Sequence, residues 1–530
     1  MSTALSSLVE GIEILETHGS LDRAVSGLAY DSRAVKPGYL FFALPGTHAD
    51  GRSFIAAAIA AGATVVIHEG ELGEYGPDTT YLRVPSSRIA MSPVSAAFYG
   101  HPSRSLAVLG VTGTEGKSTT VYLIWQLLNL SGRKAGFFST VMSDTGSGET
   151  PNPEHQTTPE ATAVQRMLAS MREAGYEYAV VESSSHGLSP KLNRLGDVAF
   201  DVGVFMNVTH EHLEFHGSFE QYRDDKANLF RALDRPAGRG PHAPGVDGAA
   251  ATHVKEIRRS ARQIPSFGVA CGDDPSAPYF ASATSKRTII FSSKGRPADF
   301  SATDIKSDER GASFTIEAGG RKAPVRIELP GAFNVDNALA ALIAVSGITG
   351  EDWEGFLPLL PRLKPVLGRM TRVECGQPFE VIVDYAHTPS SFKTVFPPIR
   401  ARATGRMICV FGSGGERDTE KRPQQGRIAA DYFDVVILAD EDPRGEDPMA
   451  LLEMIAAGCP ERRRGEDLFV IPDRPTAIHK AFELARPGDI VMLLGKGHEN
   501  SIIYAKGAMP YDEITCAREE LAGLGYKEKA

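Results

Sequence analysis

The stretch LAVLGVTGTEGKSTTVYLIWQLLNL, residues 106–130, decides the fold of this chain. Its apolar run Leu106–Val111 predicts a buried strand, and Thr119–Leu130, which stops just before Gly132, predicts a helix. A glycine-rich turn, Gly110–Ser118, joins the two. Because a strand, a glycine turn and a helix in this order are typical of a phosphate-binding loop, the centre of the chain is predicted to be an α/β domain.

The turn reads GxxGxxGKS and departs from the strict GxxxxGKS pattern, which requires glycine where Val111 stands. Glycines let backbone N–H groups approach phosphate oxygens, Lys117 adds positive charge, and Ser118 is able to hold Mg²⁺. The alternative is a glycine turn with an exposed lysine. Because strand, turn and helix agree, we expect ATP to bind at Gly113, Thr114, Glu115, Gly116, Lys117, Ser118 and Thr119.

Length and charge narrow the class of protein. A chain of 530 residues is too long for one core and predicts three or four domains. Its net charge of −10 excludes a broad basic surface for nucleic acid or anionic lipid. Five scattered cysteines indicate reduced thiols, and neither a signal peptide nor a membrane-spanning apolar run is found. We expect a cytoplasmic protein with no membrane insertion and no nucleic-acid partner.

Apolar runs that alternate with helical segments predict parallel sheets covered by helices on both faces. After Pro365 the same sequence pattern recurs: an apolar strand is followed directly by glycine or a polar residue. The strands are predicted at 381–383, 407–411, 435–438 and 490–494. Because ligands bind beyond the carboxyl ends of strands in such sheets, we expect these four ends to form one site. The segment 236–250, rich in proline, glycine and alanine, predicts a surface loop.

The segment Asn207–Gly217 follows a predicted strand and contains three histidines and two glutamates. A solvated loop is one interpretation, and His210 and His212 would also suit zinc. The phosphate loop and the lack of a nearby cysteine favour Mg²⁺, which prefers oxygen ligands. Glu182, at the end of the predicted strand 178–181, is a second candidate ligand.

These residues resemble the Mur ligase family, and most of all its members that add a diamino acid. The matching motifs are TGTEGKS at 112–118, ESSSHGL at 182–188, NVTHEHLEFHG at 207–217, DYAHTP at 384–389, EDPRGEDP at 441–448 and GKGHE at 495–499. The motifs follow the family's order from about Asp31 to Glu513. Asparagine is common in the family where this chain has Glu115.

The resemblance implies an α/β fold of three domains, with a UDP-substrate-binding domain at 1–102, a central parallel-sheet P-loop ATPase domain at 103–364 and a C-terminal Rossmann-like amino-acid-binding domain at 365–530. It implies ATP and Mg²⁺ as cofactors. The implied partners are a free diamino acid and UDP-N-acetylmuramoyl-L-alanyl-D-glutamate, whose D-glutamate carboxylate is joined to the amine with release of ADP and phosphate. A monomer is presumed.

The resemblance also implies roles for single residues. Lys117, Glu182, His212 and Lys226 are the catalytic set, and Ser118, Glu182, His212 and a carbamylated Lys226 are the implied metal ligands. Without the resemblance, Lys226 would be interpreted as an ordinary surface lysine. The nucleotide contacts are Asn334, Asn337, Arg369 and Asp384. The UDP-muramoyl contacts are Ser32, Thr157, Thr158, Ser184 and Arg194, and the amino-acid contacts are Arg417, Asp442, Arg444, Gly495 and Glu499.

The motifs specify the reaction more closely than they specify the identity of the amino acid that is added. The family motif DNPR accompanies meso-diaminopimelate, and here the motif is EDPR at 441–444. Arg444 would pair with a distal carboxylate, whereas Asp442 would favour a bare distal ammonium. We favour L-ornithine or L-lysine, with diaminopimelate as the rival. His210, Glu211 and His387 all stay open as the group that deprotonates the attacking amine.

Two other functions compete with this interpretation. A folylpolyglutamate-type ligase would share the phosphate loop and the carbamylated lysine but would lack the uridine-side domain. A regulatory P-loop ATPase would hydrolyse the nucleotide without an amine acceptor. The three functions differ in which co-substrates ADP release requires. Measuring ADP release with and without each co-substrate therefore separates them.

Overall fold

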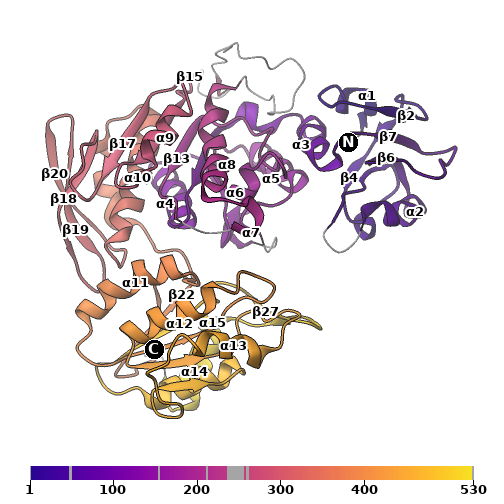
Figure 1. Ribbon diagram of the computed structural model, residues 1–530. Helices are drawn as coiled ribbons and strands as arrows, with labels where there is room; N and C mark the ends of the chain where they lie inside the picture. Colours follow the sequence, from indigo (N-terminus) through magenta and orange to yellow (C-terminus); the bar gives the residue numbers. More distant parts are fainter. Residues whose placement is uncertain are drawn as a thin grey trace.

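The computed structural model describes residues 2–46, 50–152, 156–209, 213–235, 256–257 and 262–527. The chain forms three α/β units in sequence order, each with its own main sheet (Figure 1). The expected fold class, three domains with a central parallel sheet and a C-terminal Rossmann-like domain, is confirmed. Among the helices of these described ranges, none is both long and apolar enough to cross a membrane.

The N-terminal unit is a five-stranded sheet of order β2-β7-β6-β5-β4. Its strands are β2 (Glu16–His18), β4 (Gly27–Ala29), β5 (Tyr39–Phe42), β6 (Ala63–His68) and β7 (Thr80–Arg83), and a two-stranded pair is formed by β1 (Thr3–Ala4) and β3 (Ala24–Val25). The helices are α1 (Leu5–Leu8), η1 (Ser32–Ala34), η2 (Gly51–Phe54), α2 (Ile55–Ala60) and α3 (Ser87–Phe98). The short helix α2 directly follows the 3-10 helix η2.

The central unit is an eleven-stranded sheet of order β11-β10-β9-β12-β8-β13-β16-β17-β18-β19-β20. Its strands run parallel from β9 to β18, and β10, β11, β19 and β20 add antiparallel edges. The bounds are β8 (Ala107–Thr112), β9 (Ala135–Phe138), β10 (Met142–Asp144), β11 (Thr150–Pro151), β12 (Tyr178–Glu182), β13 (Val202–Phe205), β16 (Phe267–Cys271), β17 (Thr288–Ser292), β18 (Phe300–Ser307), β19 (Ala312–Ala318) and β20 (Arg321–Ile327). The antiparallel strands at the edges were not predicted.

Helices cover both faces of this sheet. They are η3 (Pro102–Ser105), α4 (Lys117–Leu130), α5 (Ala161–Glu173), α6 (Ser185–Leu188), α7 (Leu213–His216), α8 (Phe219–Arg231), η4 (Ala232–Asp234), α9 (Ala277–Ser282), α10 (Phe333–Thr349) and η5 (Trp353–Arg362). A small strand pair, β14 (Glu256–Ile257) with β15 (Arg262–Gln263), lies apart from the sheet. The predicted surface loop at 236–250 lies outside the described residues.

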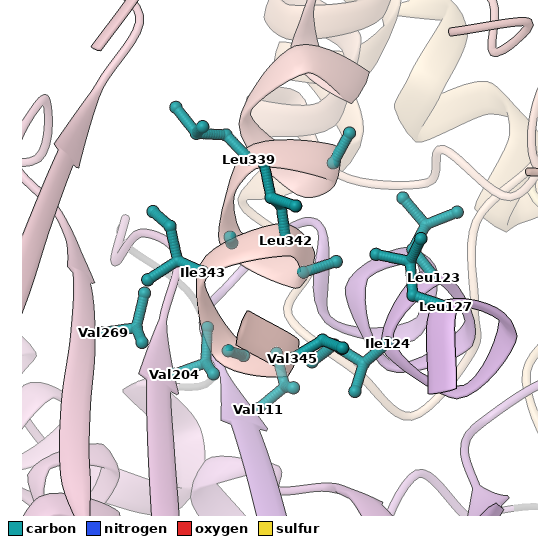
Figure 2. Packing of buried hydrophobic residues seen from close by; sticks show 14 of the residues in the cluster. Val111, Leu123, Ile124, Leu127, Val204, Val269, Leu339, Leu342, Ile343 and Val345 are labelled. Atoms are coloured by element: carbon teal, nitrogen blue, oxygen red, sulfur yellow. The ribbon is translucent and has the colours of Figure 1, made fainter. Parts of the chain in front are cut away.

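Helix α10 is apolar over most of its surface because it is buried between α4 and the sheet. Figure 2 shows Leu342 and Val345 between the α4 side chains and the strand residues Val111 and Val204. All of these side chains are fully buried. The packing holds the first turns of α4 and α10 together, and those turns carry the predicted nucleotide residues.

The C-terminal unit is a six-stranded sheet of order β21-β22-β26-β23-β24-β25. Its bounds are β21 (Thr371–Arg372), β22 (Glu380–Asp384), β23 (Met407–Phe411), β24 (Val435–Leu438), β25 (Leu468–Val470) and β26 (Ile490–Leu494), beside a hairpin of β27 (Ser501–Tyr504) and β28 (Gly507–Pro510). The helices are α11 (Pro389–Arg402), α12 (Lys421–Tyr432), α13 (Pro448–Ala456), α14 (Arg474–Leu484) and α15 (Glu513–Gly523). Because β22, β26, β23 and β24 are parallel, the four predicted strand ends meet at one edge.

Candidate active site

The phosphate loop joins β8 to α4. Gly116 caps the helix with a left-handed backbone (φ 83°), and a side chain there would lie 2.6 Å from Asn337 Oδ1. Asn207, just after the end of β13, supports the loop because its Oδ1 accepts from the Glu115 N–H at 2.8 Å. Helix α4 begins at Lys117, two residues before the predicted start. Lys117 and Ser118 therefore lie in the first helical turn, where backbone N–H groups favour an anion.

A carboxylate faces the hydroxyl of the loop. Ser118 Oγ donates to Glu182 Oε1 at 3.0 Å, and Glu182 lies at the end of the neighbouring strand β12. Thr140 donates to both oxygens of Glu182, from its backbone N–H at 2.7 Å and its hydroxyl at 3.0 Å. This group of hydroxyl and carboxylate oxygens is the donor set that suits Mg²⁺.

Lys226 is buried, with 1% of its surface exposed, so the interpretation as an ordinary surface lysine is wrong. It lies on α8 and donates from Nζ to the carbonyl oxygen of Gly113 at 2.7 Å. The ring of Tyr222 covers the ammonium at 4.4 Å, and its hydroxyl lies 3.1 Å from Thr114 Oγ1. Helix α8 thus contacts the phosphate loop directly. His210, Glu211 and His212 lie outside the described residues.

The predicted nucleotide residues come from two units. Asn337 accepts from the Thr120 hydroxyl at 3.2 Å and donates to Asn334 at 2.9 Å, which connects α10 to α4 beside the loop. In the C-terminal unit, Asp384 is buried and accepts from two backbone N–H groups, each at 2.8 Å. Burial raises the pKa of Asp384, and the nearby Arg369 opposes this shift.

Four of the five predicted UDP-muramoyl contacts lie together. The Ser184 hydroxyl donates to Thr158 Oγ1 at 2.9 Å, and Arg194 donates to the Thr158 carbonyl at 2.9 Å. Thr157 Oγ1 lies 3.1 Å from the Thr140 hydroxyl oxygen. The fifth, Ser32, begins the 3-10 helix η1 in the N-terminal unit.

The predicted amino-acid contacts surround the carboxyl edge of the C-terminal sheet. Asp442 follows β24 and is buried, Gly495 and Glu499 follow β26, and Arg444 has a left-handed backbone (φ 55°) that pairs with β27. Arg417 is exposed in the loop after β23. Several buried polar atoms at this edge lack a hydrogen-bond partner in the described structure, namely Ser413 Oγ, Asp440 Oδ1, Glu441 Oε2 and Arg444 Nε. Unpaired polar atoms at strand ends indicate a ligand site.

Sequence reasoning missed three residues of this site. Thr140 belongs to none of the matching motifs. Lys496 lies in the GKGHE motif at 495–499 but received no role from it, so only its contacts distinguish it. The third, Asp274, belongs to an aspartate pair directly after β16, a strand that the sequence analysis did not predict. Its Oδ2 accepts from the Val208 N–H at 2.8 Å and so supports the segment that leads to the histidines. The Asp-Asp-Pro run at 273–275 was the available signal.

Fold and site together define an α/β protein of the phosphate-loop class that binds a nucleotide. The family description "Mur ligase middle domain" matches residues 111–237 and 254–345, "Mur ligase, glutamate ligase domain" matches 368–497, and "Mur ligase family, catalytic domain" matches 24–97.

Curated relatives match along nearly the whole chain. A Treponema denticola protein named UDP-N-acetylmuramyl-tripeptide synthetase is 52% identical and covers 98% of both chains. A Syntrophomonas wolfei protein named UDP-N-acetylmuramoyl-L-alanyl-D-glutamate--2,6-diaminopimelate ligase is 36% identical, over 98% of this chain and 99% of the relative. A solved structure of a ligase with the same name has a TM-score of 0.63 at 28% identity, with 99% and 100% of the two chains covered.

The chain belongs to the Mur ligase family. It is an ATP-dependent ligase of the muramyl tripeptide synthetase type, which adds an amino acid to a UDP-muramoyl peptide in peptidoglycan synthesis.

Proposed function

We propose that the chain joins a diamino acid to the D-glutamate side-chain carboxylate of UDP-N-acetylmuramoyl-L-alanyl-D-glutamate, with conversion of ATP to ADP and phosphate. One observation carries this proposal. The Thr140 hydroxyl lies 3.0 Å from Glu182, which contacts the phosphate loop, and 3.1 Å from Thr157 in the predicted acceptor group. The end of the nucleotide and the acceptor carboxylate would therefore meet at Thr140.

The chemistry follows from these positions. Lys117 and the N-terminus of α4 stabilise the charge of the terminal phosphate while the acceptor carboxylate attacks phosphorus and ADP leaves. The amine then attacks the acyl phosphate, forms the amide bond and releases phosphate. The site must exclude water, because water would hydrolyse this intermediate. Contacts between the loop and the C-terminal unit, such as Thr388 to Glu115, support such closure.

The attacking amine must lose a proton. His387 Nδ1 lies 2.8 Å from the carbonyl oxygen of Tyr385, which only accepts hydrogen bonds. The proton of a neutral ring is then on Nδ1, and Nε2 is left as the basic nitrogen. This supports His387 as a candidate base, with His210 and Glu211 still open. A His387→Gln variant that kept full activity over a range of pH would exclude it.

We propose that Ser118, Glu182, His212 and Lys226 hold Mg²⁺. The oxygens at Ser118 and Glu182 fit the ion, whereas the ammonium of Lys226 would repel it. A carbamate formed from CO₂ would turn Lys226 into an anionic oxygen ligand, which makes the set consistent. We expect Glu182→Gln to raise the Mg²⁺ concentration needed for half-maximal rate, with Glu173→Gln on α5 as a matched control. An unchanged Mg²⁺ requirement would contradict the assignment.

We propose L-ornithine or L-lysine as the amino acid that is added, with meso-diaminopimelate as the rival. Asp442 supports a bare distal ammonium, and Glu441, a buried carboxylate whose Oε2 has no described partner, adds negative charge beside it. Burial raises the pKa of Glu441, so an arriving ammonium would favour its ionised form. Arg444 supports the rival because it would pair with a distal carboxylate.

One assay tests the function and its alternatives. ADP release is measured with ATP and Mg²⁺, with and without the muramoyl dipeptide, and with each of the three diamino acids. We expect release to need both co-substrates and to be fastest with ornithine or lysine. Release with a folate acceptor would favour the folylpolyglutamate-type ligase, and release with neither co-substrate would favour the regulatory ATPase.

A further inference from the structure

A completely buried lysine lies between two of the predicted amino-acid contacts. Lys496 follows β26 and has none of its surface exposed. Its Nζ donates to Asp442 Oδ1 at 2.8 Å and to Glu499 Oε2 at 2.5 Å. The two carboxylates therefore already share an ammonium that belongs to the protein. This pairing restricts how either of them can contact the substrate.

The remaining contacts of these carboxylates also come from the protein. Asp442 Oδ1 accepts from the Ile503 N–H at 2.9 Å, and Glu499 Oε1 accepts from the Tyr385 hydroxyl at 3.1 Å. The group connects the ends of β22, β24 and β26 with the hairpin strand β27. Lys496 is its centre and its cation.

The charges explain why the lysine is needed. Asp442 is buried and Glu499 is partly buried, and two neighbouring carboxylates shielded from water repel unless a cation lies between them. Burial lowers the pKa of Lys496, but the carboxylates of Glu499 and Asp442 outweigh it, so the net shift is upward and the ammonium stays charged. Without it, the carboxylates would separate or turn outward, and the loops after β24 and β26 would move with them.

We propose that Lys496 is the positioning residue of the amino-acid site, and that its ammonium holds Asp442 and Glu499 in the orientation that receives the side chain of the incoming amino acid. This inference rests on the proposed function. It assigns Lys496 no contact with the reacting atoms. A defect at Lys496 should therefore appear in the binding of the amino acid, whereas the ATP site, built on β8 and α4 of another unit, should be spared.

The test is steady-state kinetics of Lys496→Met, with KM measured separately for the diamino acid, ATP and the muramoyl dipeptide. Because removal of one partner from a buried charge pair is costly, we expect the diamino-acid KM to rise about thirtyfold or more. The KM values for ATP and the dipeptide should stay close to wild type. Lys496→Arg, which keeps the charge, should recover part of the loss.

Two further variants keep the test decisive. Lys496→Gln keeps a donor but loses the charge, and it replaces Lys496→Met if that variant does not fold. Lys480→Met is the matched control, because Lys480 lies on α14 of the same unit, is partly exposed and pairs with Glu483 on the same helix. An unchanged diamino-acid KM, or a parallel loss in all three KM values with a lower melting temperature, would overturn the proposal. No product from wild type with any diamino acid would instead refute the proposed function.

Discussion

The hydroxyl of Thr388 lies 3.3 Å from Glu115 Oε1, which joins the N-terminus of α11 in the C-terminal unit to the phosphate loop of the central unit. A second contact, from Thr209 to Ser390 at 3.2 Å, lies beside it. The predicted phosphate loop thus contacts the unit that carries the proposed amino-acid site. This relationship suggests that nucleotide binding and the position of the C-terminal unit depend on each other.

We expect the double variant Glu115→Ala, Ser390→Ala to loosen this connection. A long hydrogen bond to a charged group contributes at most about 1.5–3 kcal/mol, so the effect should be moderate. In small-angle X-ray scattering without nucleotide, the double variant should have a larger radius of gyration than wild type, with each single variant in between. Equal values for all four proteins would show that these contacts do not hold the units together.

Lys226→Ala should nearly abolish ligation, because it removes the buried group that faces the phosphate loop. A fall in kcat of about 10²–10³-fold is expected for the loss of one such electrostatic group. If Lys226 acts as a carbamate, short carboxylic acids should restore part of the rate by supplying the missing oxygens. Lys306→Ala, an exposed lysine on β18, is the control. Full activity of Lys226→Ala without any added acid would exclude the carbamate.

Asp336→Asn should stabilise the protein in a pH-dependent way. Burial raises the pKa of Asp336 to about 6, so the folded state keeps a proton that the unfolded chain releases from about pH 4 upward. The free energy of unfolding of the wild type therefore falls as the pH rises from about 4 to about 6. Above pH 6 this carboxyl causes no further loss. The gain in unfolding free energy of the variant, measured by urea denaturation, should grow over this window and then stay constant. A gain that is equal at all pH values would contradict the raised pKa.

Arg474→Met should destabilise the C-terminal unit strongly. Arg474 and Glu513 are both fully buried, and the guanidinium also donates to the Leu494 and Asp440 carbonyl oxygens at the end of β26 and just beyond β24. Removing one partner of such a pair costs about 3–5 kcal/mol because the other charge is left unpaired. The measurement is the melting temperature of the full chain.

Arg464→Met is the matched control for this change. Its partner Glu453 and Arg464 itself are both largely exposed, and an exposed pair contributes only about 0–1 kcal/mol. The control should melt close to wild type. Equal melting temperatures of the Arg474 and Arg464 variants would show that the buried pair contributes little to stability.

Local sequence patterns determined many of the strands, turns and helices of this protein. The strand, glycine turn and helix around Gly116 are encoded by neighbouring residues, because backbone conformation and apolar periodicity act over a few positions. The strands 407–411, 435–438 and 490–494 were predicted with the observed bounds for the same reason. The proposed roles of Lys117, Glu182 and the segment after β24 came from the resemblance of their motifs to the family, and they stay predictions.

Only the tertiary structure decided which of these groups meet. Lys226 contacts Gly113 across 113 positions of sequence, and Lys496 reaches Asp442 across 54. Such pairs depend on how helices pack on sheets and on which strands are neighbours, and no local pattern records either. The tertiary structure also decides which residues are buried. An exposed lysine and a completely buried one look the same in the sequence, and the surrounding packing alone makes Lys496 the cation between two carboxylates.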